Sequence, residues 1–283
     1  SYTVLYKASL ANTVFTGANL SHANLCGATN PVVKVNWPGG TYHEYRYLTF
    51  DFTGTDLSYA DFDHAQMQDV ILTDAMVMYT NFHDANFSGA DLSYKDLTGT
   101  ILTSANLTGA NLAGVDLKGR DLTGAILKGI DLTGKDLTGT ILKGADLTEA
   151  TLPSISLSDK NFQRTVFDGL DLSGKDLSES SLWDASFKNT NLENTNLGHA
   201  DFSAVDFTKI KNKSLAGSNL SDASFLLANL SGVNLSNVIL DGTNFLQTTL
   251  LDQDFTVVSE AIQGSVFMEA KLKDANFEGV NLS

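Results

Sequence analysis

The side chains of this chain best suited to acid–base chemistry or metal binding are five histidines, His22, His43, His64, His83 and His199. The repeat described below places His64 and His83 side by side, with two aspartates close to them. Imidazole and carboxylate groups together can hold a transition metal ion. Exposed histidines beside acids are nevertheless more often plain surface residues, so we expect no metal site and no cofactor.

Nothing in the sequence is typical of an enzyme. It has no nucleophile–histidine–acid set, no phosphate-binding loop and no zinc-ligand spacing. Asp and Asn recur because the repeat uses them, so neighbouring carboxylates carry no catalytic signal. We therefore predict a non-enzymatic protein without catalytic, cofactor-binding or metal-binding residues.

A repeat of five residues must position whatever this chain presents. Leu or Phe recurs at every fifth position, and the frame is unbroken from Phe52 to Phe207. On an α-helix this spacing leaves no apolar face, and on a flat strand it alternates between the two sides. A coil that turns a corner every five residues points all of them inward. We call the Leu or Phe the central position; the residue two before it, usually small, is the second inward position.

Glycine indicates how the corners are made. It fills the corner position, two residues after the central one, from Gly99 to Gly144, with Ser104 as the exception. A type II turn needs a positive φ at its third residue, which glycine adopts without strain. We expect another turn type at the corners that carry an acidic residue there, which are Asp69, Asp74, Asp84, Glu149, Asp159 and Glu179.

Stretches such as GANLSHANL, TSANLTGANL and KGADLTEATL resemble the pentapeptide repeat family, whose motif is A(D/N)LXX. The resemblance covers nearly the whole chain. It implies an all-β fold, a right-handed quadrilateral parallel β-helix with four pentapeptides, or twenty residues, in each coil. Roughly 51 pentapeptides then make about 13 coils, in a rod on the order of 60 Å long.

Five cations stand at second inward positions, where an unpaired buried charge would be too costly. They belong to a pattern of forty residues, or two coils, in which large and small inward residues alternate. We expect each aliphatic stem to lie along the core while the charged head reaches a corner or a neighbouring Asp. The five are Lys95, Arg120, Lys135, Lys160 and Lys175.

Composition limits the partners and the compartment. The net charge of −15 argues against non-specific binding to nucleic acid or to an anionic membrane, and it suits contact with a basic protein surface. One cysteine, Cys26, excludes an intrachain disulfide and indicates a reducing compartment. No signal peptide or membrane span is evident, so we expect a cytoplasmic protein, although Ser1 leaves a trimmed N-terminus open.

We predict a single domain over residues 1–283, interrupted first by a loop near 36–45. Val33 and Val35, just before the loop, could still form one side of a coil. The loop carries Trp37, Tyr42 and Tyr45, and aromatic side chains are typical of interfaces. We therefore take these three residues as candidate contacts with a partner protein.

Two shorter interruptions follow, and we expect both to be bulges. The bulge near 208–214 contains the basic cluster of Lys209, Lys211 and Lys213, and the other bulge lies near 256–261. The repeat then continues to Ser283 without a visible helical cap. An open solenoid end favours end-to-end pairing of copies or a longer protein from which this chain derives.

On the outer surface, Tyr59 and Tyr79 should stack in neighbouring coils, beside Met76 and Met78. An exposed apolar patch of this kind is a candidate contact site. Trp183 is predicted to be a second exposed aromatic side chain. The full set of candidate protein contacts is Trp37, Tyr42, Tyr45, Tyr59 and Tyr79.

The favoured interpretation is a rigid scaffold or binding module that acts through its outer surface and loop. The resemblance implies a first alternative, an acidic DNA mimic, because some bacterial members bind DNA gyrase and protect it; another topoisomerase is a related possibility. A second alternative is a targeting or substrate-binding segment of a larger bacterial effector. All three are non-catalytic, and fold class does not decide between them.

Overall fold

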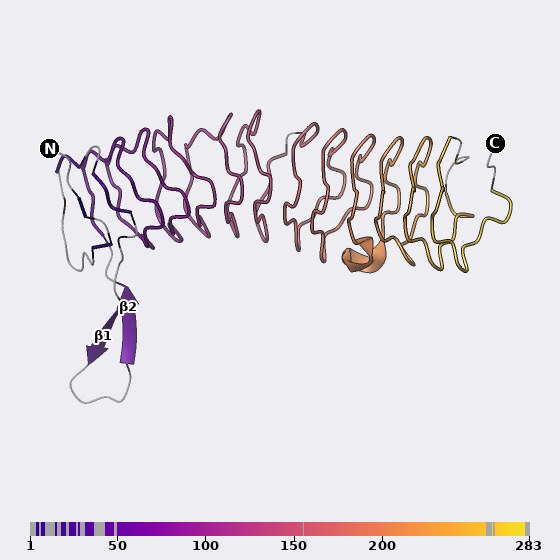
Figure 1. The fold of residues 1–283 in the computed structure, drawn as a ribbon, viewed down its shortest axis with the longest axis horizontal. Coiled ribbons are helices and arrows are strands. Elements are labelled where there is room, and N and C mark those ends of the chain that lie inside the picture. Colours follow the sequence, from indigo (N-terminus) through magenta and orange to yellow (C-terminus); the bar gives the residue numbers. More distant parts are fainter. Residues whose placement is uncertain are drawn as a thin grey trace. The chain divides into compact units, whose positions relative to one another are not determined.

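The computed structural model describes residues 4–5, 7–8, 15, 18–20, 23–26, 28, 32–36, 43–47, 50–154, 156–258, 262 and 264–280; for 32–36 and 43–47 it describes the backbone only. The chain divides into two compact units, Ser1–Thr140 and Ile141–Ser283. Each unit is a series of stacked coils (Figure 1). The single domain over residues 1–283 stays a prediction. In the described part of the chain, no helix is long and apolar enough to cross a membrane.

A regular coil contains twenty residues, as the family resemblance implied. Isolated parallel bridges join residues that are twenty apart: Asp61 pairs with Asn81 in the first unit, and Asp146 with Val166 in the second. Every five-residue side has one bridge residue or its equivalent and two turn residues, which is too short for a continuous strand. The parallel β-helix is therefore held by bridges, while its handedness and the number of coils stay predictions.

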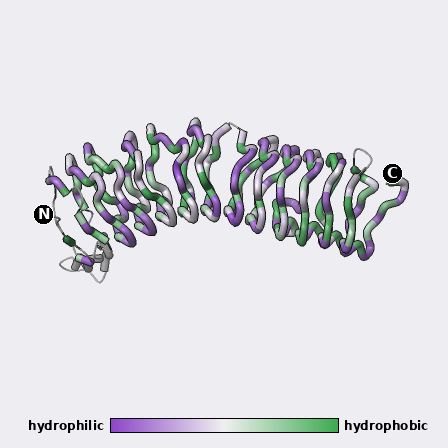
Figure 2. Tube along the Cα trace, turned by 45° about the horizontal axis from the view of Figure 1, so that its top comes forward, coloured by the Kyte–Doolittle hydropathy of each residue, from purple (hydrophilic) through white to green (hydrophobic). Residues whose placement is uncertain are grey.

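The interior of each unit is filled as the repeat predicts. Central residues such as Leu57 and Leu177 are fully buried, and so are second inward residues such as Ala65. Figure 2 shows hydrophobic and hydrophilic segments alternating along each coil. Central phenylalanines of neighbouring coils contact one another; the ring centroids of Phe167 and Phe187 are 5.2 Å apart. Side chains fill the coils, so any chemistry must be presented on the outside.

The Asp or Asn before each central residue shapes the next corner. Its side-chain oxygen accepts a hydrogen bond from the backbone N–H two residues on, as Asp136 does from Thr138 at 2.8 Å. This is an Asx turn, which explains why Asp and Asn are the commonest residues at the position. Hydrogen bonds from the hydroxyl and the N–H of Thr138 hold the pKa of Asp136 below its ordinary value of 3.8. The carboxylate therefore stays ionised near neutral pH.

Every type of corner residue adopts the backbone conformation that glycine prefers, and the prediction of another turn type at acidic corners was wrong. Gly99 has a φ of +68°, while Asp69 has +53° and Glu149 has +60°. Regular corners must turn the chain by a similar amount to bring the next side over its neighbour, so the stack imposes a positive φ on glycine and non-glycine residues alike. The described corner positions without it are Ser154, Lys209 and Val257. Asp tolerates this left-handed region better than most, and other residues accept about 1–2 kcal/mol of strain.

The inward cations leave the core by reaching backbone carbonyls of the preceding coil rather than Asp side chains. Lys135 Nζ donates to the carbonyl oxygens of Leu112 at 2.6 Å and Val115 at 2.9 Å. Lys175 Nζ donates to Pro153 O at 3.1 Å. These bonds keep the ammonium groups solvated by the protein while their stems pack inside.

Not every inward cation is satisfied in this way. The Nε atom of Arg120 is buried and has no hydrogen-bond partner among the described residues. Its guanidinium still helps to lower the pKa of Asp96, after the larger effect of hydrogen bonds from Thr98.

The first interruption is a β-hairpin. Strand β1, Val32–Asn36, pairs antiparallel with β2, His43–Tyr47, so that Val32 lies opposite Tyr47 and Asn36 opposite His43 (Figure 1). The expectation that Val33 and Val35 form a side of a coil was wrong, because both belong to β1. Their β-branched side chains suit a two-stranded ladder equally well. The bridge partners Asn24 and Asp61 are 37 residues apart, so 17 residues more than one coil lie between them.

The two later interruptions also lengthen the coil without ending the stack. The 3₁₀ helices η1, Phe207–Lys209, and η2, Lys211–Lys213, lie on either side of the buried Ile210, and their lysines are exposed. Bridge partners across this segment, such as Asp206 and Asn229, are 23 residues apart. Bridge partners on either side of residues 256–261, such as Asp254 and Asn276, are 22 residues apart.

We expect the substitution Lys135→Met to lower the free energy of unfolding by about 1–3 kcal/mol, because two carbonyl oxygens lose their donor while the stem is kept. Urea unfolding followed by circular dichroism measures the change. Lys118→Met is the matched control. Its exposed ion pair with Asp136, at 3.7 Å, should contribute less than about 1 kcal/mol. Equal losses in both variants would contradict the role given to the Lys135 ammonium.

Candidate functional site

A stacked pair of tyrosines forms the core of the candidate site. The ring centroids of Tyr59 and Tyr79 are 4.8 Å apart and the rings are nearly parallel, at 4°. This confirms the predicted stack. Both rings are about half exposed, as is Met76, while Met78 is partly covered. We call Tyr59, Tyr79, Met76 and Met78 the tyrosine face.

Backbone geometry fixes where these rings lie. Tyr59 and Tyr79 occupy corner positions, with φ values of +62° and +58°. One coil further, the corner residue is Gly99, and a Cβ atom there would come within 2.1 Å of the Tyr79 ring. Tyr79 is therefore held between the Tyr59 ring on one side and the Gly99 backbone on the other.

The remaining predicted contacts are Trp37, Tyr42 and Tyr45. Trp37 and Tyr42 lie outside the described residues. Tyr45 is in β2, where its backbone lies opposite Lys34, and its side chain is not among those described. Whether these three residues contact a partner stays a prediction.

Trp183, expected to be an exposed aromatic, is partly covered by an arginine. The guanidinium carbon of Arg164 lies 4.7 Å from the centroid of the Trp183 ring, which is a cation–π geometry. Arg164 Nε also lies 3.5 Å from the carboxylate of Asp184. The chain thus holds a guanidinium between an aromatic ring and an acid on its own outer wall.

His64 and His83 do lie side by side, with ring centroids 6.0 Å apart. The two nitrogens of His64 contact Asp63 at 2.8 Å and Asp84 at 3.2 Å, while His83 Nδ1 contacts the hydroxyl of Thr103. These contacts occupy both ring nitrogens of His64 and one ring nitrogen of His83. No group of three or more His, Cys, Asp or Glu side chains is placed to hold a metal ion within the part of the chain that the structure describes.

Next to the tyrosine face, two coils are not joined by backbone hydrogen bonds. In the coil pair just before, five bonds of 2.8–3.0 Å cross between the coils, donated by Phe52, Gly54, Leu57, Ile71 and Met76. Within residues 50–154, all described, none of the equivalent N–H groups twenty residues on donates to the facing coil, and these are Leu72, Asp74, Val77, Asp91 and Asp96. We call this opening, between residues 70–77 and 90–97, the inter-coil gap.

The inter-coil gap is closed at both ends by regular pairing. Asp69 N–H donates to Ser88 O at 2.9 Å before it, and Tyr79 N–H donates to Thr98 O at 2.8 Å after it. Lys95 lies within the opening. It stands on the face where the two preceding coils carry Thr55 and Ala75, and its stem is longer than either of those side chains. Its Nζ donates to Ala75 O at 3.2 Å, the carbonyl that the Asp96 N–H would otherwise use.

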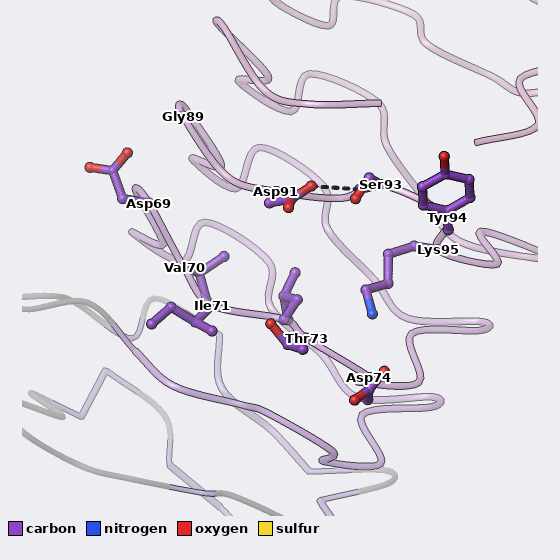
Figure 3. Close-up of a pocket in the computed structure, with 11 residues that line it drawn as sticks. Asp69, Val70, Ile71, Thr73, Asp74, Gly89, Asp91, Ser93, Tyr94 and Lys95 are labelled. Carbon is purple, nitrogen blue, oxygen red and sulfur yellow. Dashed lines mark hydrogen bonds between the residues drawn. The ribbon is translucent and has the colours of Figure 1, made fainter. Parts of the chain in front are cut away.

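The gap contains a cavity of about 540 Å³ with a mixed polar and aromatic lining (Figure 3). Three carboxylates line it, together with one ammonium group and one tyrosine, and these are Asp69, Asp74, Asp91, Lys95 and Tyr94. A smaller cavity of about 260 Å³ shares Asp74, Tyr94 and Lys95 and reaches Met76 and Met78 of the tyrosine face. The two surfaces are therefore continuous.

The lining of the cavity carries more negative than positive groups, with three carboxylates and one ammonium group. Hydrogen bonds from the Ser93 hydroxyl and N–H hold the pKa of Asp91 below its ordinary value, so this carboxylate stays ionised. Partial burial lowers the pKa of Lys95, and the carboxylates of Asp74 and Asp91 oppose that shift.

The sequence did not lead us to Tyr94 or to the inter-coil gap. A signal was present, because Lys95 replaces a small residue on a face that otherwise begins with Thr55 and Ala75. Tyr94, directly before it, also stands at a corner position where the next coil has Gly114. A large inward residue followed by a gap in pairing can be inferred only when the stacking partners are known.

Three comparisons with known proteins bear on the identity of the chain. The family model for pentapeptide repeats matches eight copies, over residues 1–29, 50–74, 80–119, 121–152, 171–208 and 214–250. No protein with a curated description gives a significant match.

Among solved structures, the chain is similar to HetL, a pentapeptide repeat protein involved in heterocyst differentiation regulation from the cyanobacterium Nostoc sp. strain PCC 7120. The identity is 25% over 99% of this chain and 89% of HetL, with a TM-score of 0.21. QnrB1, a plasmid-mediated fluoroquinolone resistance protein, is 16% identical over 93% of this chain and 87% of its own, with a TM-score of 0.28. Because these TM-scores are low, the family assignment rests on the sequence match.

Replacing Gly99 by Ala tests whether close packing fixes the Tyr79 ring. We expect the free energy of unfolding to fall by about 1 kcal/mol from the positive φ, plus about 1–3 kcal/mol because the new methyl group displaces the ring. Gly109→Ala is the control, since Gly109 has a φ of +62° and open space around its Cβ position. Urea unfolding and the near-ultraviolet circular dichroism of the tyrosines report both effects. If Gly99→Ala and Gly109→Ala give the same unfolding free energy and the same circular dichroism, Gly99 does not support the stack.

Proposed function

Because the chain belongs to the pentapeptide repeat family, we propose that it is a binding module that holds a partner protein on the tyrosine face. The family is in general one of structural or binding repeats, and the match indicates no enzyme family. The filled interior supports the same view, since no enclosed site is left inside the described coils for a substrate. Only the outer surface is available for contact.

The observation that carries this proposal is the exposed Tyr59–Tyr79 stack. Both residues stand at corner positions, where the stack imposes a positive φ and glycine would be free of strain. A bulky residue in the left-handed region costs about 1–2 kcal/mol. Tyrosine is among the residues that contribute most to protein interfaces, because its ring covers a large area and loses little entropy. Contact with a partner would offset the strain.

Trp37, Tyr42 and Tyr45 extend the proposal to the β1–β2 hairpin, on the basis of their residue types. Hairpins and loops on a regular scaffold often carry binding residues. The proposal does not depend on them, because the tyrosine face alone provides a partly apolar surface with two aromatic rings.

A double substitution tests the tyrosine face without adding strain to the backbone. Tyr59→Gly with Tyr79→Gly removes both rings and leaves the residue type found one coil on at Gly99. The wild-type chain and the variant are each immobilised and exposed to a lysate of the source cells. We expect the variant to retain roughly ten-fold less of a protein that the wild-type chain binds, since two such contacts together contribute more than about 1.4 kcal/mol.

Leu227→Gly is the matched control for that experiment. Leu227 also stands at a corner, with a φ of +61° and 61% of its surface exposed, so the substitution relieves the same strain and removes a different apolar side chain. If every retained protein binds the double variant and the control equally well, the tyrosine face is not the contact surface.

A second candidate function is mimicry of DNA toward DNA gyrase or another topoisomerase. Its support is the outward rows of aspartates whose pKa values are held low by hydrogen bonds from neighbouring Thr or Ser residues, as at Asp96, Asp131 and Asp136. Such carboxylates remain charged, like phosphates, and the net charge of the chain is −15. A protein surface that binds DNA would be attracted to them.

If DNA mimicry is the function, the purified chain should inhibit gyrase supercoiling or protect gyrase from a quinolone. The effect should weaken when salt is raised, because screening reduces attraction between surface charges. Supercoiling assays at low and moderate salt, with and without a quinolone, measure this. An absence of any effect over a wide range of protein concentrations would leave only the protein-binding module.

A further inference from the structure

The inter-coil gap combines features that together suit one kind of ligand. We infer that it binds an arginine side chain carried by an extended segment of a partner protein. This inference rests on the proposed function, because it names the chemistry of the partner that a binding module would hold beside the tyrosine face. Three independent observations support it: the charge of the cavity, the position of Tyr94 and the open backbone of both walls.

Charge selects a cation. Asp69, Asp74 and Asp91 line the cavity, and none of them forms an ion pair within 4 Å among the described residues. The one ammonium group of the lining, on Lys95, donates to the carbonyl of Ala75 instead. A guanidinium fits better than an ammonium, because its planar group can donate two parallel hydrogen bonds to a carboxylate and keeps its charge when partly buried.

Tyr94 offers an aromatic surface for the same guanidinium. It is 82% exposed, and its ring lies over Gly114, where an added Cβ atom would come within 2.3 Å of it. The backbone of Gly114 therefore covers one side of the ring, and the ring lines both cavities of the gap. A cation over a tyrosine ring contributes about 0.5–2 kcal/mol.

The chain holds an arginine between a ring and an acid elsewhere. In the second unit, Arg164 contacts the Trp183 ring and the carboxylate of Asp184. Tyr94 and Asp74 offer the same two kinds of group in the first unit, in a different arrangement, and no arginine of the described chain is paired with either of them. A partner would supply the missing side chain.

The open walls of the gap suit an extended backbone. The N–H groups of Leu72, Asp74 and Asp91 donate no hydrogen bond within residues 50–154, and neither do the facing carbonyls of Val70 and Ser93 accept one. An extended peptide pairs with such groups in the way that strands are added to a sheet edge. The cavity volume of about 540 Å³ lies within the range of about 300–1,000 Å³ that is typical of ligand sites.

The test uses a fluorescein-labelled peptide of sequence Thr-Val-Arg-Val-Thr with blocked ends, and fluorescence anisotropy with the full chain. We expect saturable binding to the wild-type chain. A matched peptide with citrulline in place of arginine has the same shape without the charge, and it should bind at least about ten-fold more weakly. Equal affinity for both peptides, or no saturable binding of the arginine peptide, would overturn the inference.

Two substitutions probe the site while keeping residue types that the repeat already uses. Tyr94→Gly introduces the residue of Gly114, and Asp91→Asn introduces that of Asn111, each one coil further on. Each should lower the affinity of the chain for the arginine peptide roughly five- to thirty-fold, in line with the loss of one cation–π contact or one charged hydrogen-bond acceptor. Unchanged affinity in both variants would place any observed binding elsewhere.

Lys95→Thr tests the opening itself. Threonine is the residue of the same face at Thr55, where the coils pair fully, so this variant should close the gap. Amide hydrogen exchange measured by NMR should then show protection of Leu72, Asp74 and Asp91 without peptide, and peptide binding should be lost. In the wild-type chain, the same three amides should become protected only when the arginine peptide is added, and an absence of that change would contradict backbone pairing.

The double variant Tyr59→Gly and Tyr79→Gly separates this inference from the proposed function. It should bind the arginine peptide as the wild-type chain does, because neither tyrosine lines the larger cavity. If a cellular partner depends on the tyrosine face while the arginine peptide fails to bind, the proposed function stands and the inference is wrong. If the peptide binds in the gap but no partner depends on the tyrosine face, the inference stands and the proposed function is wrong.

Discussion

Hydrogen bonding between the backbones of successive coils is the constraint on which the rest of each unit depends. It requires neighbouring coils to lie at the strand spacing of about 4.8 Å. That spacing limits which side chains fit at the second inward position and imposes a positive φ at most corners. Where the inward residues are Thr55 and Ala75, all five bonds form; where Lys95 follows them, none does. A large inward residue and an open ladder therefore occur together in this part of the chain.

The same constraint explains why both proposed contact surfaces lie close together. The tyrosine face and the inter-coil gap share the coils from residue 70 to residue 97, and the smaller cavity joins them through Met76 and Met78. Strain is accepted at three tyrosine corners in this region, at Tyr59, Tyr79 and Tyr94. Regular coils on a full interior offer few ways to make a specific surface. Aromatic corners and an interrupted ladder are the two that this unit uses.

Much of this could be predicted from the sequence, because a strict period places each residue inside or outside. The buried central residues, the small inward ones and the Tyr59–Tyr79 stack all follow from counting in fives. The period alone could not predict the conformation and the hydrogen bonding of the backbone. The corner conformation of Asp69, the inclusion of Val33 and Val35 in β1, and the gap beside Lys95 each depend on how neighbouring segments compete for hydrogen bonds. Such hydrogen bonds join residues that are distant in the sequence, and a single sequence gives little information about contacts of that kind.

The positive φ of the corners also has a consequence for redesigning the surface. Replacing a corner residue such as Tyr94 by glycine removes a surface group and relieves backbone strain in one step. Replacing a corner glycine by another residue lowers the stability of the fold by about 1–2 kcal/mol instead. Groups are therefore easier to remove from the corners of such a surface than to add to them.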